Sequence, residues 1–454
     1  MASSSRHPLL TRQPADIIVR AQPNAVRTDE FLGCACALAE SLPDRRYVIN
    51  LSSNRYEFLL GFCAAVIAGQ CTLLPPNRQP QTLLQIAGEC GPVYTLGGNP
   101  VAGLEFHAPE IRAGARPLQT APAIADDQLC AIVFTSGSTG APKPNRKTWG
   151  MLRAGSLSNA AVVLGELDRV LNVVATVPSQ HMWGFETSIL LPMFGAVAVS
   201  SPIPFFPMDI KDALDALPRP RALVSSPVHL QALLEAGVGA IEIDRIYSAT
   251  APTPAALARS LEAGFSARMI EIFGSSESGI FATRQPAREE VWTLAKPFAL
   301  RASGRRTLII ADHLDEPVML GDTVAMHGQR QFRWLGRDQD MINIAGKRGS
   351  LADINQRLNA LPGVSDAIAF LPSSGAKRLA ALVVAPMLEP SDILAGLRDS
   401  IDPAFLPRPI YRVPALPRQE TGKLSKKSVL DLFWDIKAKR QAVRRDNDEQ
   451  AAGD

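Results

Sequence analysis

The segment Ile132-Val-Phe-Thr-Ser-Gly-Ser-Thr-Gly-Ala-Pro-Lys143 carries more information than any other part of the chain. A short apolar run leads directly into hydroxyl side chains and glycines, and a lysine closes the segment. Gly137 and Gly140 allow backbone N–H groups to turn toward a ligand without steric cost. A concave run of amides with hydroxyls and one cation suits a polyphosphate. An ordinary polar turn after a strand is the alternative interpretation of these residues alone.

The segment differs from a Walker loop, because Lys143 does not follow a glycine and no serine or threonine comes next. Pro142 disfavours a helical conformation at Ala141. We therefore expect Lys143 to lie on a loop or a strand and not at the start of a helix.

Residues 135–143 resemble the phosphate loop of the adenylate-forming superfamily, which contains acyl- and aryl-CoA synthetases, adenylation domains of peptide synthetases, and luciferases. That loop reads Thr/Ser-Ser-Gly-Ser/Thr-Thr-Gly-x-Pro-Lys, and the match has no gap. Other motifs of the superfamily have counterparts in the expected order. These counterparts are Phe273-Gly-Ser-Ser-Glu277, Gly321-Asp322, Gly336-Arg337 and the segment 417–423, which ends in Thr421-Gly422-Lys423.

The bulk composition is that of an ordinary soluble globular protein with two or three domains. The chain has 454 residues, of which 46% are hydrophobic and 20% charged. A net charge of +3 is too small to indicate a nucleic-acid partner. We find no apolar signal-peptide core and no stretch that reaches the length of a membrane span. All six cysteines lie in the first third, which favours free thiols and a cytoplasmic location.

Strand-like and helix-like segments alternate along most of the chain. The expected strands are 47–51, 72–74, 170–177, 221–225 and 267–273, and the expected helices are 54–68, 227–235 and 254–263. This alternation predicts an α/β fold of mostly parallel sheets covered by helices. Ligands of such sheets bind at the carboxyl ends of the strands. Thr135 and Gly274 fall just after predicted strand ends, so we expect the two motifs on one rim.

Short β-like runs between residues 305 and 335 indicate a β-rich subdomain, followed by a compact α/β tail. We predict an N-terminal ATP- and acid-binding domain over residues 1–336. A small mobile α+β domain would span 337–435. The charged stretch 436–454 would be a frayed helix or a disordered tail.

The resemblance implies a role for each matched residue. Lys143 and its loop would hold the β- and γ-phosphates of ATP, and Glu277 would bind Mg²⁺. Lys423 corresponds to a mobile lysine that contacts the carboxylate and the α-phosphate during adenylation. The nucleotide-binding residues would be Thr135, Ser136, Gly137, Ser138, Thr139, Gly140, Lys143, Ala251, Phe273, Gly274, Ser275, Ser276, Asp322 and Arg337. Phe273 would stack on adenine, and Asp322 would accept hydrogen bonds from the ribose.

Two places in the sequence depart from the superfamily pattern. Gln339 stands at the hinge, where aspartate or lysine is usual, so a charge-based locking of two conformations is in doubt. Ala249-Thr250-Ala251-Pro252 resembles the Gly-Gly-Ala-Pro segment at the adenine but lacks both glycines. We expect Thr250 either to press closer to the base or to shift the loop.

Pro178-Ser-Gln-His-Met-Trp-Gly184 resembles the segment that lines the acyl pocket. Amino-acid-activating relatives have an aspartate near this point, where the present chain has Met182. A buried ammonium without a carboxylate would be costly, so an aryl or acyl acid is favoured. The expected pocket residues are His181, Met182, Trp183, Gly184 and Ser248. His181 either touches the carboxylate or gates the pocket, or it is a satisfied core residue.

The resemblance implies an ATP-dependent ligase that joins a small carboxylic acid to a thiol, namely CoA or the phosphopantetheine of a carrier protein. Gly346 would line the thiol tunnel. The chain is also similar to short ligases of aryl-polyene and xanthomonadin-type pathways, which load hydroxybenzoates or related acids. A basic face at the C-terminal end suits an acidic carrier protein. The alternatives are an acyl-AMP ligase that uses no thiol and a non-catalytic nucleotide-binding scaffold.

Overall fold

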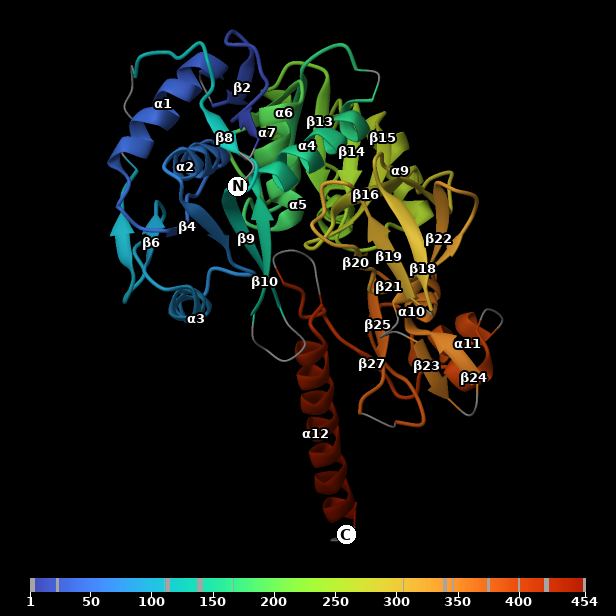
Figure 1. The fold of residues 1–454 in the computed structure, drawn as a ribbon. Helices are drawn as coiled ribbons and strands as arrows, with labels where there is room; N and C mark the ends of the chain where they lie inside the picture. The colour runs from blue at the N-terminus through green and yellow to red at the C-terminus, as the bar shows by residue number, and fades with distance from the viewer. Residues whose placement is uncertain are drawn as a thin grey trace. The chain divides into compact units, whose positions relative to one another are not determined.

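The computed structural model describes residues 5–21, 24–109, 111, 115–136, 142–165, 167–304, 306–337, 341–344, 347–373, 376–398, 401–419 and 424–451. The chain forms two compact units (Figure 1). The first contains residues 1–301 and 308–318, and the second contains residues 302–307 and 319–454. The predicted domain boundary after residue 336 stays a prediction.

One sheet of the first unit has the strand order β10-β9-β5-β4-β6-β7. Its neighbouring strands are parallel except for the antiparallel pair of β9 and β10. The strands are β4 (Tyr47–Asn50), β5 (Cys71–Leu74), β6 (Val93–Leu96), β7 (Glu105–His107), β9 (Leu129–Ser136) and β10 (Pro142–Thr148). Helix α2 (Arg55–Ile67) connects β4 to β5, and α3 (Pro80–Cys90) connects β5 to β6, as crossover connections between parallel strands require.

A second sheet of this unit has the order β17-β16-β15-β14-β13-β11-β12-β2-β3. The strands from β15 to β2 are parallel, and antiparallel strands stand at both ends of this series. The strands are β2 (Ile17–Arg20), β3 (Ala25–Arg27), β11 (Leu171–Ala175), β12 (Val197–Ser200), β13 (Arg221–Ser225), β14 (Arg245–Ser248), β15 (Arg268–Ser275), β16 (Gly279–Arg284) and β17 (Val291–Leu294).

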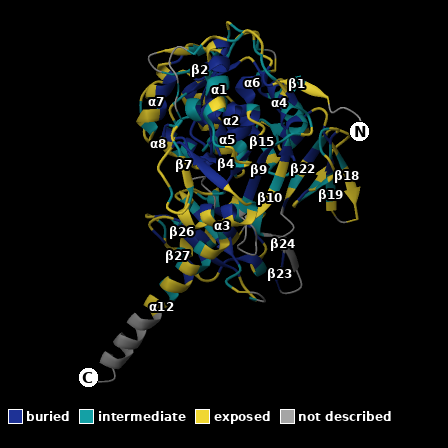
Figure 2. Ribbon diagram, turned by 60° about the vertical axis from the view of Figure 1, so that its left-hand side comes forward, coloured by how far each residue is buried: buried dark blue, intermediate teal, exposed yellow. Residues whose placement is uncertain are grey.

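Helices cover these sheets, and α2 packs against strands of both of them. Every residue of α2 from Phe58 to Val66 is buried, which is the pattern of a helix with an apolar surface all round (Figure 2). The other helices of the unit are α1 (Thr28–Ser41), α4 (Trp149–Leu164), α5 (Met182–Phe185), α6 (Leu191–Phe194), α7 (Pro207–Asp215), α8 (Pro227–Glu235) and α9 (Ala255–Phe265). A π-helix, η1 (Glu186–Leu190), joins α5 to α6. The predicted α/β class is confirmed.

The second unit contains the antiparallel pair β21 (Asp322–Met326) and β22 (Gln331–Arg337) and a three-stranded sheet. That sheet consists of β25 (Asp366–Phe370), β26 (Ala380–Val384) and β27 (Ile410–Arg412). The remaining pair is β23 (Met341–Ile344) and β24 (Lys347–Ser350), and the helices are α10 (Leu351–Asn359), α11 (Pro390–Arg398) and α12 (Lys426–Ala451). A core cluster made only of residues between 342 and 410 packs α10 and α11 on this sheet.

Two further predictions concern cysteines and membrane spans. All six cysteines are free thiols, three of them buried and three half-buried, as expected. Within the described ranges, no helix has both the length and the apolar character that crossing a bilayer requires.

Candidate active site

The predicted phosphate loop connects the two strands of a hairpin. Thr135 and Lys143 are partners in the antiparallel register of β9 and β10, and the Thr135 hydroxyl donates to the Lys143 carbonyl oxygen at 3.5 Å. Lys143 is exposed and lies on a strand, so its predicted location is confirmed. Gly137, Ser138, Thr139 and Gly140 lie outside the described residues.

The prediction of one common rim for the two motifs is wrong in detail. Thr135 belongs to β9 of the first sheet and Gly274 to β15 of the second, and both lie inside their strands. Packing of the two sheets still brings the motifs together. The ammonium of Lys147, on β10, donates to the carbonyl oxygen of Glu277 at 2.7 Å. The sequence pattern could not reveal this contact, because it depends on how two separate sheets pack.

The Phe273–Glu277 motif forms the end of β15 and the turn into β16. The Phe273 ring is half-buried, with its centroid 5.0 Å from those of Phe281 and Trp292. A side chain at Gly274 would approach the Gly279 carbonyl oxygen to 2.8 Å, so this turn requires glycine. Ser275, Ser276 and Glu277 are half-buried. The predicted Mg²⁺ ligand therefore sits at a turn with access to solvent.

Thr250, which stands where the superfamily has glycine in the adenine segment, has an unusual backbone conformation. Thr250 has φ of +79°, in the region that glycine adopts freely and a β-branched residue rarely does. The chain thus keeps a conformation that favours glycine although the glycine is missing. Ala251 next to it is exposed. Ser248, the last residue of β14, is buried and accepts a hydrogen bond from the Thr253 hydroxyl at 3.1 Å.

The predicted acid-binding segment leads into a short helix. His181 immediately precedes α5, which contains Met182, Trp183 and Gly184. A side chain at Gly184 would come within 2.1 Å of the Pro178 carbonyl oxygen, so only glycine allows this tight approach. His181, Met182 and Trp183 are half-buried.

A buried arginine holds this segment in place. The Arg55 guanidinium donates to the hydroxyls of Ser179 and Ser188 at 3.2 and 2.6 Å and to the carbonyl oxygens of Ala175 and Val177. Its side chain is fully buried, and desolvation lowers the pKa of Arg55 to about 9. Because one fork-shaped group binds residues before, within and after the segment, we infer that Arg55 positions it.

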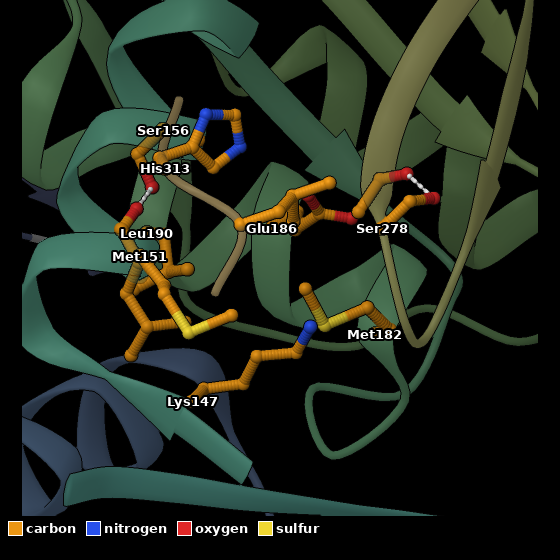
Figure 3. Close-up of a pocket in the computed structure, with 12 residues that line it drawn as sticks. Lys147, Met151, Ser156, Met182, Glu186, Leu190, Ser278 and His313 are labelled. Atoms are coloured by element: carbon orange, nitrogen blue, oxygen red, sulfur yellow. Dashed lines mark hydrogen bonds between the residues drawn. The ribbon is translucent and has the colours of Figure 1, made fainter. Parts of the chain in front are cut away.

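A small pocket lies beside the acid-binding segment (Figure 3). It has room for about one water molecule. Met182 of the predicted substrate pocket contributes to its wall. The other lining residues are Lys147, Met151, Leu152, Gly155, Ser156, Glu186, Leu190, Ser278, Gly279, His313 and Leu314. Lys147 extends from β10 toward the middle of the pocket, and Glu186 comes from the start of η1 (Figure 3).

The pocket contains three ionisable groups that the sequence analysis missed. Glu186 Oε1 accepts from the Asn159 amide at 3.0 Å and from the Ile280 N–H at 3.1 Å. Burial raises the pKa of Glu186 to about 7, although these bonds and Lys147 oppose the shift. Burial lowers the pKa of Lys147, against the attraction of Glu186. Burial and then Lys147 lower the pKa of His313.

One sequence signal pointed to Glu186. It follows Met182 by four residues, a spacing that places both on one face of a helix. The expectation that no carboxylate stands near Met182 therefore overlooked Glu186. No comparable signal existed for Lys147, because its burial depends on the packing of β10 beside the turn that follows β15.

In the second unit, Asp322 and Arg337 are partners in the register of β21 and β22. The Trp334 indole N–H donates to Asp322 Oδ1 at 2.8 Å. The antiparallel pair thus places two predicted nucleotide-binding residues opposite each other. Lys423, Gly346 and Gln339 lie outside the described residues, so their predicted roles remain predictions.

The described residues fit ATP and magnesium by their chemistry. Thr135 and Lys143 present a hydroxyl and an exposed cation at facing positions, which suits phosphate oxygens. In the described part of the chain, no three His, Cys, Asp or Glu side chains cluster as a metal site. A single carboxylate such as Glu277 suits Mg²⁺, which takes its other oxygen ligands from phosphates and water.

Comparison with known proteins identifies the family to which the chain belongs. Residues 34–318 match the model of the AMP-binding enzymes. The chain is 30% identical over 310 residues to a 4-coumarate–CoA ligase of Rhodobacter capsulatus, covering 64% of this chain and 74% of that enzyme. It is 27% identical over 262 residues to a 4-coumarate–CoA ligase of Halorhodospira halophila, covering 57% of this chain and 63% of that enzyme.

A solved structure has the same fold. The ATP-bound MatB of Rhodopseudomonas palustris matches with a TM-score of 0.80 at 18% identity, over 94% of this chain and 97% of that chain. The family model covers more than half of the present sequence, including the phosphate-loop hairpin and the turn with Glu277. The chain belongs to the AMP-binding enzymes, within the adenylate-forming superfamily.

Proposed function

We propose that this chain is an ATP-dependent ligase that activates an aryl or acyl acid as its adenylate and transfers the acyl group to a phosphopantetheine thiol. The observation that carries the proposal is the contact between Lys147 and the Glu277 carbonyl, which sets the phosphate-loop hairpin beside the turn of the proposed magnesium ligand. The similarity to two 4-coumarate–CoA ligases supports an aromatic acid.

In the first half-reaction, a carboxylate oxygen of the acid attacks the α-phosphorus of ATP. The bond from this phosphorus to the bridging oxygen breaks, and pyrophosphate leaves. An anion approaches a polyanion in this step, so the protein must supply cations and positioned donors. Lys143 and Thr135 would bind the leaving phosphates, and Mg²⁺ held by Glu277 would neutralise part of their charge.

In the second half-reaction, a thiolate attacks the acyl carbonyl carbon and AMP leaves with the electron pair of the broken C–O bond. Lys423 is proposed to act only in adenylation and Gly346 to line the path of the thiol. Both CoA and a carrier protein fit this chemistry. An acyl-AMP ligase that stops after the first half-reaction is the competing function.

The test is exchange of labelled pyrophosphate into ATP, measured with a panel of aryl, acyl and α-amino acids. We expect exchange with aromatic acids and none with α-amino acids. Addition of CoA or of a carrier protein with a free phosphopantetheine thiol then shows whether AMP release is coupled to thioester formation. Robust exchange with an α-amino acid contradicts the substrate assignment, and accumulation of acyl-AMP without thioester in the presence of the thiol supports the competing function.

A further inference from the structure

The pocket beside Met182 holds a lysine and a carboxyl group for which the proposed mechanism has no use. Lys147 and Glu186 are 4% and 5% exposed. The Lys147 ammonium makes one hydrogen bond, to the Glu277 carbonyl, among the described residues. In the same part of the chain, Glu186 accepts its two hydrogen bonds at Oε1, and we find none at Oε2. Both groups therefore keep hydrogen-bonding capacity inside a small pocket.

Such capacity is costly to bury without a partner. A buried polar group that lacks a hydrogen bond costs roughly 1–3 kcal/mol, and a charged group costs more. Met151 and Leu190 in the same wall are apolar, and the hydroxyls of Ser156 and Ser278 already donate to backbone carbonyl oxygens, so few protein groups can compensate. The two partly satisfied groups therefore favour a ligand with polar atoms at this position.

The backbone is shaped to place Glu186 at this position. Glu186 is the first residue of η1, and π-helices are rare and frequently found at functional sites. Gly279, at φ +73°, leaves the space that its Glu186 neighbour occupies, since a side chain there would approach Oε1 to 2.7 Å. The carboxyl group thus depends on two unusual features of the chain.

We propose that this pocket binds a hydroxyl group carried by the acid substrate, which donates to Glu186 Oε2 and accepts from the Lys147 ammonium. The proposal rests on the proposed ligase function, because it places the hydroxyl on the acid that is activated. Met182 lines both this pocket and the predicted acid site, which connects the two. Lys147 and Glu186 are then specificity-determining residues.

Charge and size select the hydroxyl over other substituents. A second carboxylate would meet Glu186, and an ammonium would meet Lys147, so each charged group gains one partner and suffers one repulsion. A methyl group would leave both side chains unsatisfied. A hydroxyl both donates and accepts, and it fits a space of about one water molecule.

The first test uses the wild-type protein and benzoic acids that differ at one ring position. The substituents are hydrogen, hydroxyl, carboxylate and aminomethyl, with a set for each ring position. We expect kcat/KM in pyrophosphate exchange to be at least about tenfold higher for one hydroxy acid than for its three counterparts, because sites that bind a hydroxyl reject analogues without it. Equal use of the hydroxy and unsubstituted acids overturns the proposal.

The second test uses Glu186→Gln and Lys147→Met. We expect each variant to lower the preference for the hydroxy acid by about tenfold. Glu186→Gln should raise relative use of the dicarboxylic acid, and Lys147→Met relative use of the aminomethyl acid. Lys211→Met, at a half-buried position of α7 where the lysine pairs with Asp215, is the control and should keep the wild-type preference. Variants that lose activity equally with all four acids indicate a structural role and overturn the proposal.

Calorimetric binding of the free acids separates this proposal from the ligase assignment. If no acid supports exchange, the ligase function fails. Binding of a hydroxy acid that is at least about tenfold tighter than that of its parent acid, and that weakens in Glu186→Gln, still upholds the pocket assignment. Equal affinity for the hydroxy acid and its parent acid overturns the pocket assignment. If neither variant folds, the wild-type binding ratio decides alone.

Discussion

Lys143 and Lys147 lie four residues apart on β10, yet their surroundings are opposite. Lys143 is exposed at the phosphate-loop hairpin, whereas Lys147 is buried against the turn that carries Glu277. The first matches a motif that can be read in the sequence, and the second matches none. An exposed cation can meet the changing charges of ATP, and a buried cation can act only on groups that fit beside it. The comparison separates the residue that we propose for catalysis from the residue that we propose for specificity.

The largest expected effect is the loss of activity when the exposed Lys143 is replaced. Lys143→Met should lower kcat/KM for pyrophosphate exchange by about 10²–10³, the usual loss when one donor to developing charge is removed. Because Lys143 is exposed, the free energy of unfolding should change by no more than about 0.5 kcal/mol. Exchange kinetics and urea unfolding measure the two quantities. A variant that keeps wild-type exchange would break the assignment of Lys143 to the phosphates.

The next effect concerns the carboxyl group beside the buried lysine. Burial raises the pKa of Glu186 from 4.5 to about 7, so the folded protein holds a proton that the unfolded chain releases between these values. Stability from this group is therefore fully present below pH 4.5 and falls as pH rises through about 7, by at most about 3 kcal/mol. Glu186→Gln should remove this decline.

The measurement is urea unfolding of wild type and Glu186→Gln at several pH values between 4.5 and 8. The difference in unfolding free energy, wild type minus variant, should become smaller as pH rises. Buried Glu271 contributes equally to both proteins and cancels in the difference. Glu235→Gln, at an exposed position of α8, is the control. A difference that stays constant with pH would show that Glu186 titrates normally.

A smaller effect is expected at the adenine segment. Thr250 has φ of +79°, and such a conformation costs a non-glycine residue about 1–3 kcal/mol. Thr250→Gly relieves this strain but gives the unfolded chain more freedom, so we expect a net stabilisation of about 1 kcal/mol. The stability of Thr250→Ala should lie between those of the wild type and Thr250→Gly, because alanine is not β-branched. Thermal unfolding measures the series, and a less stable glycine variant would contradict the strain.

The sequence was sufficient for the family and for features carried by local pattern. The strand at 221–225 and the helix at 227–235 agree with β13 and α8 residue for residue, because turns and apolar periodicity mark their ends. Lys143 was placed correctly on a loop or strand, whereas Thr135 lies inside β9 and not after its end. The prediction of a common rim was wrong, and the pocket that contains Lys147 and Glu186 was not predicted. Both features depend on how separate sheets pack against each other. A π-helix such as η1 has no clear sequence signature.

The smallest effect is expected from exposed lysines of the second unit. Several basic residues near the C-terminal end are already engaged. Arg418 pairs with Asp366, Lys439 pairs with Asp435, and Lys437 lies over the Trp434 ring. Lys426 and Lys427 are exposed in the first turn of α12, where positive charge is unfavourable for a helix. Two exposed lysines at such a position suit an acidic partner. We propose that this partner is the carrier protein.

Reversal of both charges, Lys426→Glu and Lys427→Glu, should therefore act in opposite directions on stability and docking. The helix should gain about 0.3–1 kcal/mol per residue at low salt. Loading of an acidic carrier protein should slow several-fold, and the wild-type rate itself should fall as salt rises, because exposed charges are screened beyond about 8 Å at physiological ionic strength. Loading of a small pantetheine thiol should be unchanged. If both thiols slow alike, the lysines serve the reaction or the fold, and if neither slows, the carrier protein docks elsewhere.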